Sequence, residues 1–346
     1  MRAINSILTL TIVVLLTSTG IVVEAASGVE WKSVLIPLPQ GTPGIGFDDL
    51  FYAPTLKRIL APAGRTGSLD LIDPTNNSIS EIRGFNVQDS YSGGHADSVT
   101  SADEGAGFLF ATDRTSKSVK MINSRTKKII ASADLRASPD YVRFVASTNE
   151  IWVTEPEAEQ IEILSLQTQV PVKMESKVII KIVGGPESLI IHSSQKKAYS
   201  HLWKGQSVEI DIKSRKITNT WKNDCVGSRG IALNEKHGFL FAGCSEGKAV
   251  VLDINHDGKI LSKLQTGAGV DIISYNSRLS HLYVPAAKTQ KLEVLAVSST
   301  GELTKIVTGK IALQSHCVAS DGRKGIWVCD PSHGQLIYFE DSGVAK

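Results

Sequence analysis

Residues 239–253 read FLFAGCSEGKAVVLD. An apolar and aromatic segment, 239–242, is followed by a turn rich in glycine and then by a second segment, 250–253. Short apolar or alternating runs that are bounded by turn residues indicate β-strands. The stretch therefore predicts a strand, a turn and a second strand.

The same pair of segments occurs seven times along the chain. The second segments lie at 69–72, 119–122, 161–164, 208–211, 250–253, 292–295 and 336–339. About ten residues before each lie the first segments, at 58–61, 108–111, 151–154, 198–201, 239–242, 282–285 and 326–329. The six steps between 69 and 336 average about 44 or 45 residues. The chain is therefore an array of seven repeats.

A repeat of this length, with about four strands per copy and no long helical period, is typical of β-propeller blades. We predict an all-β, seven-bladed β-propeller over residues 26–346. The last repeat is one strand short, and residues 29–36 supply a spare strand that closes the ring and covers the open sheet edges. The expected blades are approximately 46–83, 94–134, 138–177, 184–222, 227–265, 267–310 and 314–342.

The strand Leu282-Tyr283-Val284 and its variants at 239–241 and 151–153 are each followed by a strand and a turn. These features resemble the YVTN-repeat, YncE-like seven-bladed propellers of exported bacterial proteins. The resemblance covers nearly the whole chain after the leader. It implies the fold and export from the cytoplasm, and it implies no particular ligand.

Composition excludes several classes of protein. The 346 residues include 37 Lys and Arg against 35 Asp and Glu, so bulk charge does not favour nucleic acid or an anionic membrane as partner. Hydrophobic residues make up 42% and charged residues 21%, which excludes wholesale disorder and a multi-span membrane protein. We expect a monomeric domain whose partner is a protein or a small ligand.

The first 25 residues have the layout of a secretory signal peptide. Arg2 precedes an apolar stretch at 7–16, and small residues at 25–26 end it, so we expect cleavage after Ala25. The alternative is an uncleaved membrane anchor over 4–23. The leader predicts a secreted or periplasmic protein that does not insert into the membrane once the leader is removed.

The four cysteines are candidates for disulfides in such a compartment. Cys225 and Cys244 flank one predicted turn, and Cys317 and Cys329 flank another. Because a hairpin brings such residues side by side, we predict the pairs Cys225–Cys244 and Cys317–Cys329.

Charged residues converge at one mouth of the predicted channel. Aligning the innermost strands on their apolar cores places one residue of each blade there, namely Asp48, Asp97, Asp140, Glu187, Arg229, Asp271 and His316. Loop residues at this mouth include Arg114 and Trp203, and Trp203 either stacks against a ligand or packs on its own blade. Crowded carboxylates raise one another's pKa unless a cation compensates them.

One interpretation of the residues at this mouth is that they bind a metal ion. Closure of the ring groups His95, His316, Asp97 and Asp48, which suit Zn, Mn, Fe or Cu, whereas the acids at 140, 187 and 271 suit Ca or Mg. The alternatives are a small organic ligand or a water-filled channel. No cofactor is identified beyond a candidate divalent metal ion.

Three functions fit these observations. The first is an exported binding or scaffold protein that recognises a cation, a small ligand or a partner protein at the acid-rich mouth. The second is a metal-dependent hydrolase, lactonase or lyase, with Asp48 or Asp49 as general base. The third, an accessory protein of a redox enzyme, follows from the resemblance. No complete catalytic constellation is present, which favours binding over catalysis.

Overall fold

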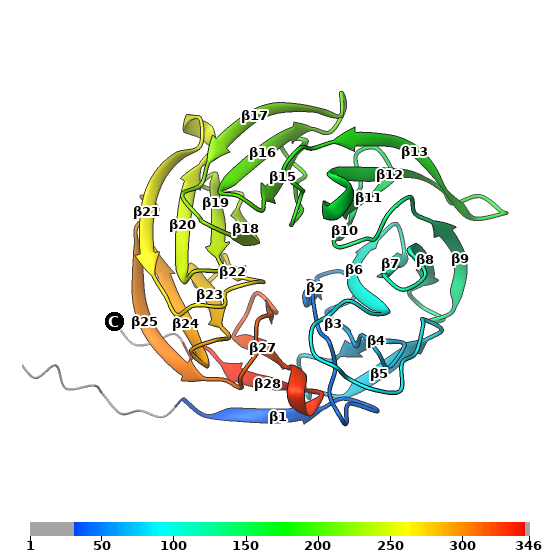
Figure 1. The fold of residues 1–346 in the computed structure, drawn as a ribbon, viewed down its shortest axis with the longest axis horizontal. Coiled ribbons are helices and arrows are strands. Elements are labelled where there is room, and N and C mark those ends of the chain that lie inside the picture. Colours follow the sequence, from blue (N-terminus) through cyan, green and yellow to red (C-terminus); the bar gives the residue numbers. More distant parts are fainter. Residues whose placement is uncertain (1–30, 343–346) are drawn as a thin grey trace, which may run out of the picture. The chain divides into compact units, whose positions relative to one another are not determined.

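Seven four-stranded antiparallel sheets follow one another around a ring in the computed structural model, which describes residues 31–342 (Figure 1). The part described contains no α-helix. The fold is therefore an all-β, seven-bladed β-propeller, as predicted. The signal peptide expected over residues 1–25, and the alternative anchor over 4–23, lie outside the described residues.

Each of the first three blades is formed by four consecutive strands. Blade 1 consists of β2 (Phe51–Ala53), β3 (Arg58–Pro62), β4 (Ser68–Ile72) and β5 (Ile79–Arg83). Blade 2 consists of β6 (Val99–Gly105), β7 (Phe108–Asp113), β8 (Ser118–Asn123) and β9 (Ile129–Asp134). Blade 3 consists of β10 (Val142–Val145), β11 (Glu150–Glu155), β12 (Gln160–Gln167) and β13 (Lys173–Lys181).

The next three blades repeat the pattern. Blade 4 consists of β14 (Ile190–His192), β15 (Lys197–Leu202), β16 (Gln206–Asp211) and β17 (Lys216–Lys222). Blade 5 consists of β18 (Ser228–Asn234), β19 (Phe239–Cys244), β20 (Lys248–Asp253) and β21 (Lys259–Gln265). Blade 6 consists of β22 (Ser274–Asn276), β23 (His281–Ala286), β24 (Lys291–Val297) and β25 (Leu303–Lys310).

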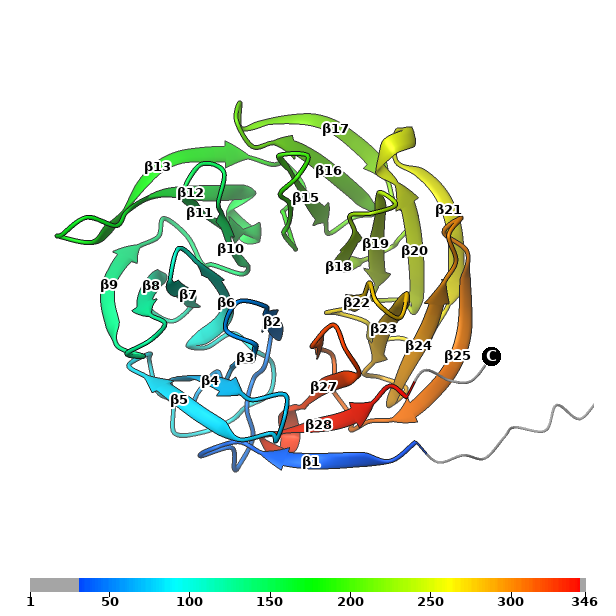
Figure 2. The same cartoon turned by 180° about the vertical axis from the view of Figure 1, so that it is seen from behind.

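Blade 7 is closed by the start of the described chain. Its strands are β26 (Val318–Ser320), β27 (Gly325–Asp330), β28 (Gln335–Glu340) and β1 (Ser33–Pro37). In the register between β1 and β28, Ser33 lies opposite Phe339 and Pro37 opposite Gln335. Figure 2 shows β1 along the outer edge of this blade. The predicted closure of the ring by an N-terminal strand is confirmed.

Burial explains the repeated sequence pattern. The second strand of a blade is covered on both faces by the adjacent blades, so every residue of β11 and β27 is buried. The outermost strand β9 instead alternates between half-buried and exposed residues, because one face meets solvent. The apolar and aromatic segments seen in the sequence are therefore the middle of each sheet.

The outer two strands of blades 2 to 6 share a shift in register. In blade 3, for example, the shift falls between Ile163 and Leu164. A β-bulge of this kind bends one strand and increases the local twist. The outer strands can therefore curve around the rim of the ring, as Figure 1 shows for β13 and β17.

Both predicted cysteine pairs lie at disulfide distance. The Cα atoms are 5.2 Å apart for Cys225–Cys244 and 5.6 Å apart for Cys317–Cys329. The first pair fastens the segment before β18 to the end of β19, and the second fastens the segment before β26 to β27.

Three short 3₁₀ turns complete the described structure: η1 (Pro156–Ala158), η2 (Ile254–His256) and η3 (Pro331–His333). A search of the described residues for a helix long and apolar enough to cross a membrane found none.

Candidate functional site

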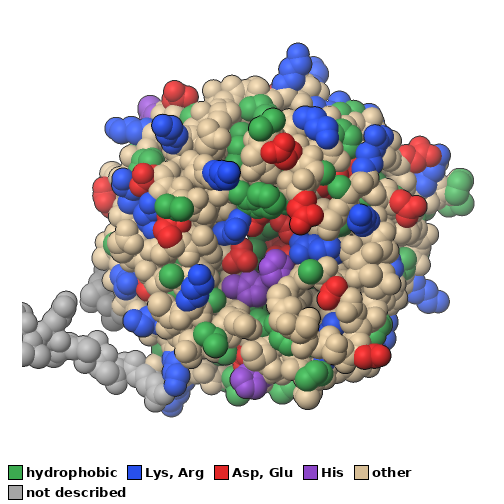
Figure 3. Space-filling view, viewed as in Figure 1, with side chains coloured by type: hydrophobic (Ala, Val, Ile, Leu, Met, Phe, Trp, Pro, Cys, Tyr) green, Lys and Arg blue, Asp and Glu red, His purple; other side chains and the backbone are tan. Residues whose placement is uncertain are grey.

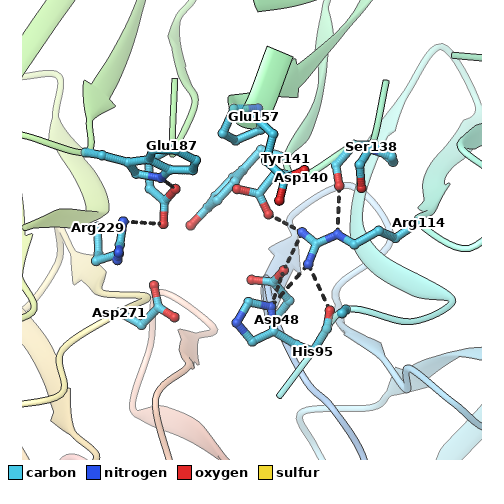
Figure 4. Close-up of a pocket in the computed structure, with 14 residues that line it drawn as sticks. Asp48, His95, Arg114, Ser138, Asp140, Tyr141, Glu157, Glu187, Arg229 and Asp271 are labelled. Carbon is cyan, nitrogen blue, oxygen red and sulfur yellow. Dashed lines mark hydrogen bonds and ion pairs between the residues drawn. The ribbon is translucent and has the colours of Figure 1, made fainter. Parts of the chain in front are cut away.

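A cavity of about 360 Å³ opens at the centre of the ring, where the innermost strands begin (Figure 3). Six blades contribute to its wall. Its acidic residues are Asp48, Asp140, Glu157, Glu187 and Asp271, and its basic residues are Arg114, Arg229 and His95. Figure 4 shows their side chains turned towards one another. The cavity is therefore charged and has an excess of acidic groups.

Four of the five acids, all except Glu157, are positioned by the chain just before an inner strand. Asp140 precedes β10, and its backbone N–H donates to the carbonyl oxygen of Thr154 at 2.9 Å. Glu187 precedes β14, and its N–H donates to the carbonyl oxygen of His201 at 2.9 Å. The inner strand is thus anchored to the next strand of its own blade, and the side chain before it faces the axis of the ring.

Two glycines allow the close contacts on which the site depends. A Cβ atom on Gly46 would clash with the carbonyl oxygen of Gly94, directly before His95. A Cβ atom on Gly230 would clash with the carbonyl oxygen of Asp271. Any larger residue at either position would push His95 or Asp271 away from the cavity.

Arg114 connects the first three blades. Its guanidinium lies 3.1 Å from the Asp48 carboxylate and also pairs with Asp140. It donates further hydrogen bonds to the carbonyl oxygens of Pro139 and His95, each at 2.9 Å. With two carboxylates and two backbone carbonyls as partners, Arg114 is a structural anchor of the site, with little freedom to bind a ligand.

Asp48 and His95 form an ion pair, with Oδ2 and Nδ1 3.1 Å apart. Burial on its own would raise the pKa of Asp48, but the charges of His95 and Arg114 lower it to about 2. The Asp48 carboxylate raises the pKa of His95 to about 9, against the effect of burial. At neutral pH the pair is therefore ionised, and Asp48 holds the imidazole in one orientation.

The pKa values of Asp140 and Glu187 are raised, whereas that of Asp48 is lowered. Burial and the nearby Asp48 raise the pKa of Asp140 to about 7, although Arg114 opposes the shift. Burial and Asp140 raise the pKa of Glu187 to about 9, although Arg229 lies 3.0 Å away. Glu187 therefore retains its proton at neutral pH and Asp140 is about half protonated, chiefly because burial disfavours the charged forms and the neighbouring acids add to this effect.

Trp203 lies in the wall of the cavity and is half-buried. Its indole N–H donates to the Glu187 carboxylate, and its ring lies against Gly185. Trp203 thus packs on its own blade and fixes Glu187, while one side of the residue borders the cavity.

His316 lies beside His95, with ring centroids 5.4 Å apart. Its Nδ1 is 2.6 Å from the carbonyl oxygen of Gln314, and its Nε2 is 3.0 Å from that of Phe47. Together with Asp271, the two histidines bring three donor atoms within 4.8 Å of one another. Two imidazoles and a carboxylate are a suitable donor set for a transition metal.

The structure differs from the sequence alignment at Asp97. This residue lies in a small pocket lined by Arg65 and Tyr91, and His95 faces the central cavity in blade 2. The register of β6 shifts between Val99 and Ala102. An alignment of apolar residues does not detect such a shift. Among the other predicted residues of the mouth, Trp203 lines the cavity, and His316 lines an adjoining pocket that it shares with His95 and Asp271.

Two titratable residues of the wall were not among the predicted ones. Tyr141 follows Asp140 directly, and Glu157 is carried by η1 after β11. Pro156 marks the turn that carries Glu157, but nothing in the sequence indicates that this turn reaches the axis of the ring.

A second cavity of about 260 Å³ lies along the inner strands, and Tyr141 borders both cavities. Apolar and aromatic residues dominate its wall, and Asp49 and Arg143 are the charged residues among those that line it. The Arg143 guanidinium binds both oxygens of Asp49, at 2.7 and 3.1 Å. It also lies over the rings of Phe51 and Tyr141.

Comparison with known proteins supports the fold. No family model matches the chain, and no curated protein sequence matches it. Many solved structures do. They include a chain of Kuenenia stuttgartiensis hydrazine synthase, with 12% identity, a TM-score of 0.70 and coverage of 88% of this chain and 99% of that one.

Two further structures are similar. A chain of a mitotic checkpoint complex has 12% identity and a TM-score of 0.71, and the match covers 97% of this chain and 98% of that one. The β-propeller domain of Myceliophteria thermophila Cps50 (Swd1) has 11% identity and a TM-score of 0.67, with 86% and 97% covered. At such low identity these matches show a β-propeller fold.

Proposed function

We propose that this protein is an exported binding protein that takes up a cation at the charged mouth of its propeller. The single observation that carries the proposal is the excess of acidic groups around the cavity, five against two arginines and His95. A bound cation relieves the repulsion between these groups, and this relief is a source of binding free energy.

The protonation of two carboxyl groups in the cavity supports this proposal. Asp140 and Glu187 keep protons because burial and neighbouring acids disfavour their charged forms. A cation in the cavity favours the charged forms, so binding should release protons to the solvent. Uptake of the cation is therefore coupled to pH, and it is stronger at pH 8 than at pH 6.

Export is supported by the two cysteine pairs at disulfide distance, since disulfides persist in oxidising compartments. It agrees with the leader-like sequence of residues 1–25 and with the resemblance to YVTN-repeat propellers. We propose the periplasm or the extracellular space as the place of action.

The hydrolase alternative has less support from the geometry. Asp48 has a pKa near 2 and is paired with His95 and Arg114, so it is a poor general base. Asp49 faces away from the mouth and is bound by Arg143. Binding without turnover is therefore the function that these residues favour.

The test uses the mature chain and small cations of different kinds. Calorimetric titrations with Ca²⁺, Co²⁺, putrescine and choline, each repeated in two buffers of different ionisation enthalpy, measure affinity and released protons. We expect at least one cation to bind with proton release. Asp140→Asn and Glu187→Gln should each reduce the number of protons released. If none of the four cations binds, or if neutral 1,4-butanediol binds as well as putrescine, the proposal is wrong.

A further inference from the structure

Three potential metal ligands from distant parts of the chain meet on one side of the charged cavity. His95 precedes β6, Asp271 precedes β22 and His316 precedes β26, so blades 2, 6 and 7 each supply one group. Their donor atoms all lie within 4.8 Å of one another. Figure 3 shows histidine side chains gathered in the central hollow. The ring fold, and not the local sequence, creates this cluster.

The two imidazoles are oriented as metal-binding histidines usually are. A histidine that binds a metal through one ring nitrogen generally donates the other N–H to a carboxylate or a backbone carbonyl. Nδ1 of His95 lies 3.1 Å from the Asp48 carboxylate, and Nδ1 of His316 lies 2.6 Å from the carbonyl oxygen of Gln314. In both residues Nε2 is then the nitrogen that is left for a metal, and in the ionised His95 the metal would replace the proton on this nitrogen.

The contact between His316 and Phe47 is a second, independent observation. With the proton on Nδ1, the lone pair of Nε2 faces the Phe47 carbonyl oxygen at a distance of 3.0 Å. Two lone pairs at this distance repel each other unless a cation or a proton lies beside them. Two ligands about 2.1 Å from a metal and at right angles to each other are about 3 Å apart. The 3.0 Å between His316 Nε2 and the Phe47 carbonyl oxygen therefore matches the separation of two neighbouring ligands of one metal ion.

Asp271 supplies the negative charge. Within residues 31–342 its side chain takes part in no hydrogen bond or ion pair, although it faces the cavity. The nearby arginines are occupied, since Arg114 pairs with Asp48 and Asp140, and Arg229 pairs with Glu187. The charged His95 interacts with Asp271 electrostatically, and a metal ion at the cluster would bind this carboxylate directly.

We propose that His95, Asp271 and His316 together bind one divalent first-row transition metal ion. The Phe47 carbonyl oxygen is an adjacent ligand, and Asp48 and the Gln314 carbonyl orient the imidazoles. Two nitrogen donors favour such a metal over Ca²⁺ or Mg²⁺, which prefer sites made of oxygen. This inference rests on the proposed function for the role of the cavity and deepens it by naming one cation that the cavity takes up.

The experiment is a titration of the metal-stripped mature chain with Co²⁺, followed by visible absorption and by calorimetry. We expect one Co²⁺ per chain, which Zn²⁺ displaces and Ca²⁺ does not. Asp271→Asn and His316→Asn should each weaken Co²⁺ binding by about 100-fold or more. Asp48→Asn should weaken it by about 10-fold to 100-fold, because this residue acts only through His95.

The matched control is His256→Asn. His256 also faces a carboxylate through Nδ1, at 2.7 Å from Asp253, but it lies on an exposed turn away from the cluster. We expect this variant to bind Co²⁺ as the wild type does. An equal loss of affinity in His256→Asn would show that surface histidines bind the metal, and this result would overturn the proposal.

Folding and binding can be separated. Because Asp271 has no side-chain partner among the described residues, Asp271→Asn keeps the metal-free melting temperature, even if His316→Asn fails to fold. Unchanged Co²⁺ affinity in Asp271→Asn contradicts the proposed ligand set. Binding of putrescine or choline without binding of Co²⁺ or Zn²⁺ refutes the metal site and leaves the proposed function standing. Absence of binding by every cation refutes both.

Discussion

The two cavities along the axis use the same kinds of side chain in different ways. At the mouth, Arg114 is shared between Asp48 and Asp140, and the Asp271 side chain forms no hydrogen bond or ion pair within residues 31–342. In the second cavity, Arg143 binds both carboxylate oxygens of Asp49. In the inner Asp49–Arg143 pair one acid faces one base, and aromatic rings cover the guanidinium. The mouth instead has more acidic than basic groups. The comparison separates charges that support the fold from charges that are available to a ligand.

Asp48 and Asp49 make the difference explicit, because they are adjacent in the chain. Neighbouring cations lower the pKa of Asp48, whereas burial raises the pKa of Asp49 despite Arg143. Successive residues of an extended chain point to opposite sides, so one aspartate reaches the mouth and the other the interior.

The largest effect on stability should come from the inner pair. Arg143→Met leaves Asp49 and the nearby Asp103 buried without their cation, so we expect the free energy of unfolding to fall by about 3–5 kcal/mol. At the mouth, Arg229 is 34% exposed, and Arg229→Met should cost less than about 1 kcal/mol. Urea unfolding of both variants measures the difference, and equal losses would remove the distinction between the cavities.

The second-largest effect on stability is expected from the disulfides. Replacing either cysteine pair by alanine should lower the free energy of unfolding by about 2–4 kcal/mol, because the unfolded chain loses a constraint. The Cys317–Cys329 pair directly follows His316, so its loss should also weaken Co²⁺ binding, by about 10-fold. Loss of Cys225–Cys244 should leave Co²⁺ affinity nearly unchanged. Similar affinity in both double variants would show that the bridge beside His316 does not support the mouth.

A smaller effect concerns the pH dependence of the metal-free protein. The pKa of Asp140 is raised to about 7, so between about pH 4 and pH 7 the folded chain holds a proton that the unfolded chain has lost. The free energy of unfolding therefore decreases as pH rises through this range, by at most about 1.4 kcal/mol per pH unit for one proton. Unfolding curves for Asp140→Asn at pH 5, 6 and 7 should show a shallower decrease. An unchanged slope would mean that Asp140 is ionised across this range.

The smallest effect on stability is expected for Asp271→Asn. This change preserves shape and removes no partner, so the free energy of unfolding should change by less than about 0.5 kcal/mol. Thermal and urea unfolding of the metal-free variant measure this. A large loss of stability would place Asp271 with the inner pair, among residues that support the fold.

Much of the architecture was predictable from the sequence. The repeat of apolar segments indicated seven blades, and the missing strand of the last repeat indicated closure by the start of the mature chain. The cysteine pairs followed from turns, because a turn determines which residues of a hairpin face each other. These features depend on residues close together in the chain or on simple counting.

The candidate site was predictable only in part. Five residues aligned on the inner strands line the cavity, Asp48 among them, and His316 lines the adjoining pocket beside His95. Asp97 does not line the cavity. The register of β6 shifts just after this residue, so the number of residues between the apolar part of the strand and the mouth differs from that in the other blades. The role of Arg114 as the link between Asp48 and Asp140 could not be predicted either, because these partners lie 66 and 26 residues away in the sequence.

The sequence by itself therefore determined the all-β class, the number of blades, the closure of the ring and the cysteine pairing, because periodicity and turns are local properties. Only the tertiary structure decided which charged groups meet at the axis. It made Asp271, and not Asp97, the carboxylate beside His95 and His316, and it left the Asp271 side chain without a hydrogen bond or ion pair among the described residues. The physical reason is that ring closure brings together residues more than 200 positions apart, and small shifts in strand register then select which side chains face one another.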